Sequence, residues 1–205
     1  MYARSTTIKG DPSAVDAGIA HVRDEVLPKV TTLDGCLGMS FVIDRETGRG
    51  IATTAWESEE ALNASAERVG SIRSRATEIM NAEAPLVENW EVAAMHRNHT
   101  SRDGSCCRIT WTHAPDLDTT VDFWRNELLP KFERMDGFCS ASMLIDRVGS
   151  RTCGTVTFDS RAALEASRAE AATIRDLAAR AVGVEFLDVA EFELAMAHLR
   201  LPELV

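Results

Sequence analysis

The chain of 205 residues repeats itself at an offset of 102 positions without a gap, and this repeat restricts its fold more than any other feature. A constant offset between many matched positions indicates two copies of one unit, each of about 100 residues. We therefore predict a first half over residues 1–97, a polar linker over 98–105 and a second half over 106–205. The matched pairs are Leu27-Pro28-Lys29 with Leu129-Pro130-Lys131, Asp34-Gly35 with Asp136-Gly137, Ile43-Asp44-Arg45 with Ile145-Asp146-Arg147, Ala61-Leu62 with Ala163-Leu164, Ile72-Arg73 with Ile174-Arg175, and His96 with His198.

Each copy shows the element order β-α-β-β-α-β. Apolar residues of the first long helix, from Val15 to Leu33, are spaced by 4, 3, 4, 4 and 3 positions, which is the helical period. Gly48 lies in the turn between two alternating runs, a hairpin signal, and Ser58 is a good N-cap for a second helix. The expected strands of the first copy are 3–9, 37–44, 50–57 and 86–96, with 106–113 and 187–198 in the second; the second helices are 58–80 and 160–181.

This pattern predicts an α+β protein made of tandem ferredoxin-like βαββαβ repeats, whose antiparallel sheets pair into one α+β barrel within the chain. Two helices cover one face of each sheet, and we expect the other face to meet its counterpart in the second copy. Because alternate residues of a strand point to opposite faces, we expect the large Trp90 and Phe192 beneath the helices. Glu91 and Glu193 then lie between the two sheets, hydrogen-bonded to hydroxyls or backbone amides.

Charge and cysteine usage exclude several classes of function. The net charge of −10, from 22 basic and 32 acidic residues, argues against nucleic acid and anionic membranes as partners. No apolar run is long enough to cross a membrane, and the first residues lack the apolar core of a secretion signal. Five cysteines without a C-x-x-C motif indicate reduced thiols, with no predicted metal site, in a cytoplasmic protein; a disulfide between Cys106 and Cys107 is the rarer alternative.

The segment from Asp34-Gly35 to Trp56-Glu57-Ser58-Glu59-Glu60-Ala61-Leu62 resembles the antibiotic-biosynthesis-monooxygenase family, as does its repeat from Asp136-Gly137 to Ala163-Leu164. That family belongs to the dimeric α+β barrel superfamily, so the resemblance implies a fused pair. It also implies an oxygenase that works without metal or flavin, holding a phenolic substrate between sheet and helices. The haem-degrading branch carries a histidine in the second helix. Residues 58–80 and 160–181 contain none, so no cofactor is predicted and haem is disfavoured.

The candidate site residues come from the first copy. We predict catalytic roles for His21 and His96, because histidine acts as a base near neutral pH. His21 is matched by Phe123, which makes it the marker of a site present only in the first copy. The substrate-binding candidates are Trp56, Trp90, Phe41, Met39 and Arg73; the second copy offers Phe158, Phe192, Met143, Trp124 and Phe123.

Each candidate also has a structural explanation. Aromatic residues at these spacings are more often part of a core, His96 can be an exposed strand end, and Arg73 can pair with a carboxylate. The sequence thus indicates a small-molecule-binding protein, either a cofactor-independent oxygenase of aromatic substrates or a non-catalytic ligand sensor, stress-response protein or scaffold. The expected form is a monomer with an internal pseudo-dimer, or a homodimer of it.

Overall fold

The computed structural model describes residues 1–199 and 202–204, and both copies have the predicted β-α-β-β-α-β order. None of the helices among these residues is both long enough and apolar enough to span a bilayer. The first copy contains β1 (Tyr2–Lys9), α1 (Val15–His21), α2 (Leu27–Val30), β2 (Cys36–Ile43), β3 (Arg49–Trp56), α3 (Glu59–Ala64), α4 (Ala66–Ile79) and β4 (Leu86–Arg97). The second contains β5 (Cys106–His113), α5 (Leu117–Phe123), α6 (Leu129–Phe132), β6 (Phe138–Asp146), β7 (Arg151–Phe158), α7 (Arg161–Ala166), α8 (Arg168–Val182) and β8 (Glu185–Leu199).

Two compact units share these strands. Unit 1 comprises residues 1–90 and 193–201, and unit 2 comprises 91–192 and 202–205, so β4 and β8 each contribute to both units. In unit 1, β3 pairs with β1 and β2, and β2 pairs with the end of β8; in unit 2, β7 pairs with β5 and β6, and β6 pairs with the end of β4. Every one of these pairs is antiparallel. The resulting strand order β1-β3-β2-β8-β5-β7-β6-β4 closes on itself, which confirms the predicted α+β barrel.

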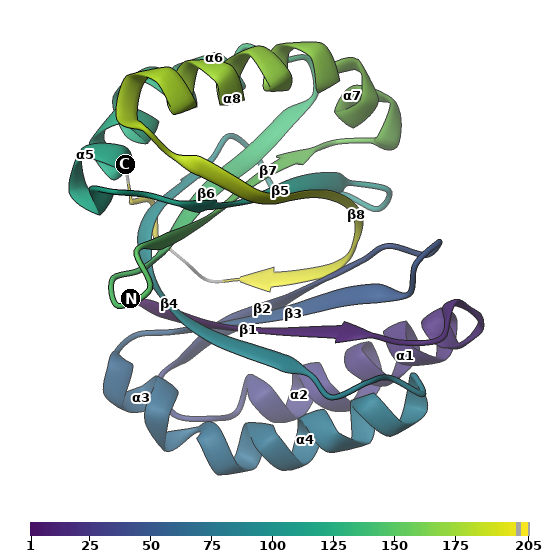
Figure 1. Cartoon of the computed structure of the whole chain (residues 1–205). Coiled ribbons are helices and arrows are strands. Elements are labelled where there is room, and N and C mark those ends of the chain that lie inside the picture. Colours follow the sequence, from purple (N-terminus) through teal and green to yellow (C-terminus); the bar gives the residue numbers. More distant parts are fainter. Residues whose placement is uncertain (200–201, 205) are drawn as a thin grey trace. The chain divides into compact units, whose positions relative to one another are not determined.

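Helices cover one face of the sheet in each unit (Figure 1): α1 to α4 in unit 1, and α5 to α8 in unit 2. The first long helix of each copy is interrupted by a π-helical turn, η2 (Val22–Val26) and η3 (Trp124–Leu128). Each π turn lies just before Pro28 or Pro130, which has no N–H to donate and would clash with a regular α turn. The predicted second helices are each divided in two, at Ser65 and Ser167.

The repeat offset is 102 from the first helix onward, but 104 in the first strands. Tyr2 pairs with Trp56, whereas Cys106 pairs with Phe158. The gapless match is therefore wrong for this strand, because the connection from β1 to α1 is two residues longer than that from β5 to α5. Arg108 corresponds in consequence to Arg4, not to Thr6.

The predicted faces of β4 and β8 are reversed in the part of each strand before its β-bulge, which lies at residues 92–94 in β4 and 194–196 in β8. Beyond the bulge of β4, Ala94 pairs with the pocket residue Met143 and lies on the predicted, helix-facing side. Arg4 Nη1 donates to Ser65 Oγ at 2.9 Å beneath the helices, so its neighbour Ser5 lies on the opposite face of the sheet. Trp90 Nε1 donates to Ser5 Oγ at 2.9 Å, and Trp90 therefore points away from the helices of unit 1. Glu191 accepts a hydrogen bond from Arg108 on the helix side of the sheet. Phe192, the counterpart of Trp90, is the next residue along the strand and therefore points away from the helices.

Glu91 and Glu193 consequently lie on the helix side of their sheets. Their partners are guanidinium groups, those of Arg147 and Arg45, and not the hydroxyls or amides we expected. The expectation failed because it assigned faces by side-chain size. The face turned away from the helices is also buried, with Trp90 2% and Phe192 0% exposed, so size does not distinguish the two faces.

Candidate functional site

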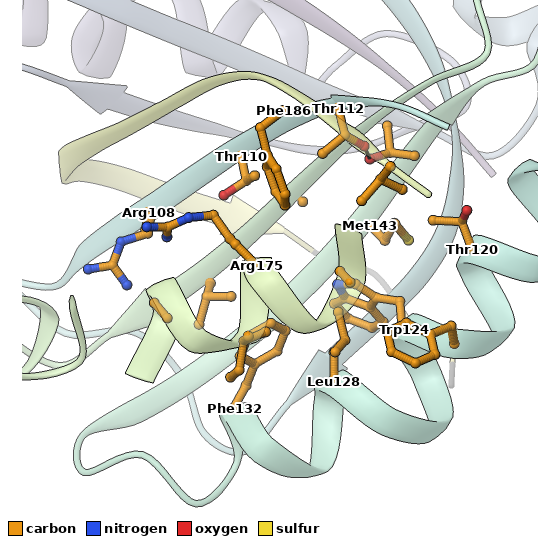
Figure 2. Close-up of a pocket in the computed structure, with 18 of the residues that line it drawn as sticks. Arg108, Thr110, Thr112, Thr120, Trp124, Leu128, Phe132, Met143, Arg175 and Phe186 are labelled. Carbon is orange, nitrogen blue, oxygen red and sulfur yellow. Dashed lines mark hydrogen bonds between the residues drawn. The ribbon is translucent and has the colours of Figure 1, made fainter. Parts of the chain in front are cut away.

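A pocket lies in unit 2 between the sheet formed by β5, β7 and β6 and the helical layer formed by α5, η3, α6 and α8 (Figure 2). The space unoccupied by atoms is about 750 Å³, the open solvent at its mouth included. Most of its lining is apolar, with a few threonine hydroxyls and two arginines. The main lining residues are Arg108, Thr110, Thr112, Thr120, Phe123, Trp124, Leu128, Phe132, Met143, Thr152, Gly154, Val156, Phe158, Ile174, Arg175 and Phe186.

The room in this pocket depends on Gly154 of β7. A Cβ atom built on this glycine would lie 3.9 Å from Trp124 Nε1 and 3.9 Å from the Thr110 carbonyl oxygen. Trp124 lies on the π turn η3, and its ring packs against Phe132 with centroids 6.1 Å apart and planes tilted by 57°. The absent side chain at position 154 therefore leaves an opening beside an aromatic wall, where a flat ring could pack.

Arg108 is a structural part of the wall. Its Nη1 donates to Ser167 Oγ at 3.0 Å, and its Nη2 donates to the Leu164 carbonyl at 3.0 Å and to Glu191 Oε1 at 2.8 Å. The residue is only 6% exposed. A buried guanidinium with these partners fixes β5 against the start of the α7–α8 layer.

Arg175 is different, because it makes no hydrogen bond or ion pair within the described part of the chain. Burial, and secondarily the charge of Arg108, lower the pKa of its guanidinium, but arginine stays protonated in proteins. In Figure 2 its side chain extends from α8 towards Arg108, while Trp124 and Leu128 line the other end of the pocket. The carboxylates of Asp176 and Glu191 are near enough to raise the pKa of Arg175 partly again, but neither contacts its guanidinium. A half-buried cation with no direct carboxylate contact at the edge of an apolar pocket favours an anionic ligand.

Unit 1 has an equivalent but smaller pocket, of about 570 Å³ with the open solvent at its mouth included. Two matched positions have larger side chains in unit 1, Phe41 for Met143 and Ala52 for Gly154. Three others have smaller ones, since Val22, Val26 and Val30 replace Trp124, Leu128 and Phe132. Met80 is fully buried and lies against Gly18, where a Cβ would come within 2.7 Å of the Met80 sulfur. Arg73, the counterpart of Arg175, has a buried Nε without a hydrogen-bond partner, and burial lowers its pKa.

The structure brings together only some of the predicted substrate-binding residues. Phe41, Met39 and Arg73 line the unit 1 pocket. Trp56 is fully buried in the core, where its Nε1 donates to Thr54 Oγ1 at 3.0 Å, and it is not part of the lining. Trp90 lies on the other face of the sheet, as described above.

Neither predicted catalytic histidine lines a pocket between sheet and helices. His21 lies in a separate groove between the first long helix and α4, lined also by Glu25, Lys29 and Arg75. Burial lowers the pKa of His21, and its buried Nε2 has no hydrogen-bond partner. His96, at the end of β4, stacks on Phe138, with Nε2 2.8 Å from Glu133 and Nδ1 3.1 Å from Glu203. Catalytic roles for both remain predictions.

Sequence reasoning missed Arg108 and Gly154. Under the 102-residue offset Arg108 is matched with Thr6, which conceals its correspondence with Arg4. The signal that could have revealed it is an arginine inside the first strand of both copies, since an arginine within a strand flanked by apolar residues needs a buried partner. Arg175 was visible as the repeat of Arg73.

Fold and pocket together define the class of protein: a tandem α+β barrel chain of the antibiotic biosynthesis monooxygenase type. The family model "Antibiotic biosynthesis monooxygenase" matches residues 1–68. A proposed monooxygenase of Lactobacillus acidophilus NCFM aligns over 97% of this chain and 96% of its own, with a TM-score of 0.69 and 10% identity. An anthrone oxidase-like protein aligns over 100% and 94%, with a TM-score of 0.65 and 13% identity. At these identities the likeness establishes the fold alone.

More specifically, the chain belongs to the family of two Mycobacterium tuberculosis H37Rv proteins. It is 48% identical over 207 residues to "Uncharacterized protein Rv2557", covering 100% of this chain and 92% of the relative. It is 50% identical over 208 residues to "Uncharacterized protein Rv2558", covering 100% and 88%. Nearly full coverage at this identity means that these relatives share the tandem arrangement.

Proposed function

We propose that the unit 2 pocket binds a planar phenolic molecule as its anion, and that the protein is a cofactor-independent oxygenase of that molecule. The observation that carries this proposal is the unpaired guanidinium of Arg175 beside an aromatic pocket whose wall is opened by Gly154. The aromatic lining supplies hydrophobic and stacking contact, and the arginine supplies charge for the phenolate oxygen.

In the proposed reaction the substrate provides the electrons. The phenolate, C6H5O⁻ in the simplest case, reacts with O2 at a ring carbon, and loss of water gives the quinone; with its proton counted, phenol plus O2 gives quinone plus water. One oxygen atom enters the ring and the other leaves as water. The protein positions the ring and stabilises the anion, and such preorganised electrostatic contacts are the main source of rate in many enzymes.

The pocket offers no side chain that could remove the phenolic proton. Its lining contains no histidine and no carboxylate among the described residues. The cation of Arg175 would instead lower the pKa of the bound phenol, so that the phenol ionises on binding. We thus expect acidic phenols and fused-ring hydroxy compounds to be preferred over simple phenol.

The test combines ligand binding with oxygen uptake on one panel of phenolic compounds. Arg175→Met should weaken binding of the phenolate at least tenfold, and Gly154→Ile should abolish it by filling the opening beside Trp124. The matched controls are Arg73→Met and Ala52→Ile, which make the same changes in unit 1. If the unit 1 controls lose as much phenolate binding as the unit 2 variants, the site is not the unit 2 pocket. Unchanged binding in Gly154→Ile would have the same meaning.

A non-catalytic role is the second candidate, and the absence of a base from the lining favours it. A ligand sensor would bind the phenolate in the same pocket with the same dependence on Arg175. Binding without oxygen uptake and without conversion of the ligand under air would establish this alternative.

A further inference from the structure

A cluster of metal-ligating side chains lies in unit 2, outside the pocket. His99, Cys139 and Asp159 each offer one ligand atom, and these atoms lie within 4.8 Å of one another. His99 follows the end of β4, Cys139 belongs to β6, and Asp159 follows β7. Three elements separated in sequence thus direct a nitrogen, a sulfur and an oxygen to one point.

The backbone around the cluster is held in place by hydrogen bonds. The amides of Asn98 and His99 donate to the Cys139 carbonyl at 2.9 and 3.4 Å, and Cys139 Sγ lies 3.3 Å from the His99 carbonyl. The amide of Asp159 donates to the Gly137 carbonyl at 2.8 Å. Since each ligand residue is fixed by backbone contacts, the three side chains are already close to the positions that a metal would require.

The cluster combines a buried ligand with accessible ones. Cys139 is fully buried, whereas the side chains of His99 and Asp159 are about one-third exposed, at 31% and 33%. His99 Nε2 and Asp159 Oδ1 lie 2.8 Å apart, within hydrogen-bond distance. A small outward movement of these two exposed groups would let an ion enter from solvent and reach the sulfur.

We propose that His99, Cys139 and Asp159 bind a zinc ion through three protein ligands, with water in the fourth position. Thiolate, imidazole and carboxylate are the three ligand types that zinc accepts, and four-coordinate tetrahedral geometry is its usual arrangement. On binding, the thiol loses its proton to solvent and the sulfur coordinates as thiolate, with no change of oxidation state. The ion would fasten the segment between the two copies to the sheet of unit 2.

The first copy cannot form this site. At the equivalent place in unit 1, Leu37 and Glu57 occupy the positions of Cys139 and Asp159, and the repeat matches His99 with Leu201. We therefore expect one zinc ion for each chain. The spacing of the ligands at 99, 139 and 159 matches no short metal motif, which is why the sequence predicts no metal.

The experiment uses the full-length protein, freed of metal with a chelator and titrated with zinc and separately with cobalt(II). We expect one equivalent of either ion to bind, and the cobalt form to show a sulfur-to-metal charge-transfer band in the near ultraviolet together with the visible bands of a tetrahedral site. His99→Gln should weaken zinc binding at least tenfold, and Cys139→Ser should remove the charge-transfer band. The control Cys36→Ser alters a half-buried thiol of unit 1 and should leave both signals unchanged.

Melting curves show whether the variants fold. His99→Gln changes a side chain that is about one-third exposed, so without zinc it should melt at the same temperature as the parent. Added zinc should raise the melting temperature of the parent by mass action, and raise that of His99→Gln much less. The proposal is overturned if the parent binds no stoichiometric zinc, if its cobalt form lacks the thiolate band, or if His99→Gln binds zinc as tightly as the parent.

Discussion

Arg45 Nε lies 2.7 Å from Glu193 Oε2, although the two residues are 148 positions apart. The counterpart pair, Arg147 Nε and Glu91 Oε2, is also separated by 2.7 Å. Each arginine belongs to the hairpin of one copy, and each glutamate belongs to the last strand of the other copy. These ion pairs therefore fasten β8 into unit 1 and β4 into unit 2.

Substitution of either glutamate should cost little stability. The side chains of Glu91 and Glu193 are 35% and 33% exposed, so solvent screens both pairs. Glu91→Gln and Glu193→Gln should each lower the free energy of unfolding by less than about 1 kcal/mol, and the loss should shrink at high salt. Urea unfolding at low and high ionic strength measures this. A loss above about 2 kcal/mol would mean that the pairs are effectively buried.

Arg108→Met should lower the free energy of unfolding about twice as much as the matched Arg4→Met. Although burial raises the pKa of Glu191, hydrogen bonds from Arg168 and Arg108 hold it below its ordinary value. Without Arg108, the Glu191 carboxylate keeps only more exposed partners such as Arg168. We therefore expect Arg108→Met to lower the free energy of unfolding by about 3 kcal/mol. The corresponding partner of Arg4 is the neutral Asn89, so Arg4→Met should cost about half as much. Denaturant unfolding of the two variants compares them, and equal losses would contradict the role assigned to Glu191.

Met80→Ala should open a cavity beside Gly10 and Gly18 of unit 1 at a cost in stability. Met80 is fully buried and fills the space beside Gly10 and Gly18, where the second copy has the smaller Val182. Truncation of a buried methionine to alanine costs about 2–5 kcal/mol, because a cavity remains. Thermal melts measure the cost, and a small apolar ligand that restores the melting temperature would demonstrate the cavity. A variant as stable as the parent would show that the site collapses around the smaller side chain.

Stability should depend on pH through His21. Burial lowers the pKa of this imidazole in the folded chain, so the folded state binds protons less readily than the unfolded chain. The resulting stabilisation is complete above the unfolded value of about 6.5 and is lost as the pH falls towards the folded pKa. His21→Phe introduces the residue of the second copy, and the gain in melting temperature should be larger at pH 5.5 than at pH 8, at roughly constant ionic strength. The same gain at both pH values would exclude His21 as the titrating group.

The sequence alone was sufficient for the repeat, the element order and the two helix caps at Ser58 and Ser160, because these depend on local period and local hydrogen bonds. It also predicted that Phe41, Met39 and Arg73 lie around one pocket. Residues on the helix-facing side of a strand pack against the helix that covers the sheet, so these positions come together. The same reasoning misplaced Trp90 and Glu91, because alternation gives two sets of residues without saying which set faces the helices. Both faces of the sheet are buried, so large apolar residues occur on either one and side-chain size does not identify the face that the helices cover.

Tertiary structure decided which copy holds the larger pocket and where the metal-ligating cluster forms. The pocket reflects differences of single side chains at matched positions, Gly154 against Ala52 and Met143 against Phe41, whose effect depends on how neighbouring elements pack around them. The cluster of His99, Cys139 and Asp159 comes from three elements that strand pairing brings together. The sequence thus determined the repeating unit through local periodicity, whereas the sites follow from contacts between distant residues, which only the folded chain establishes.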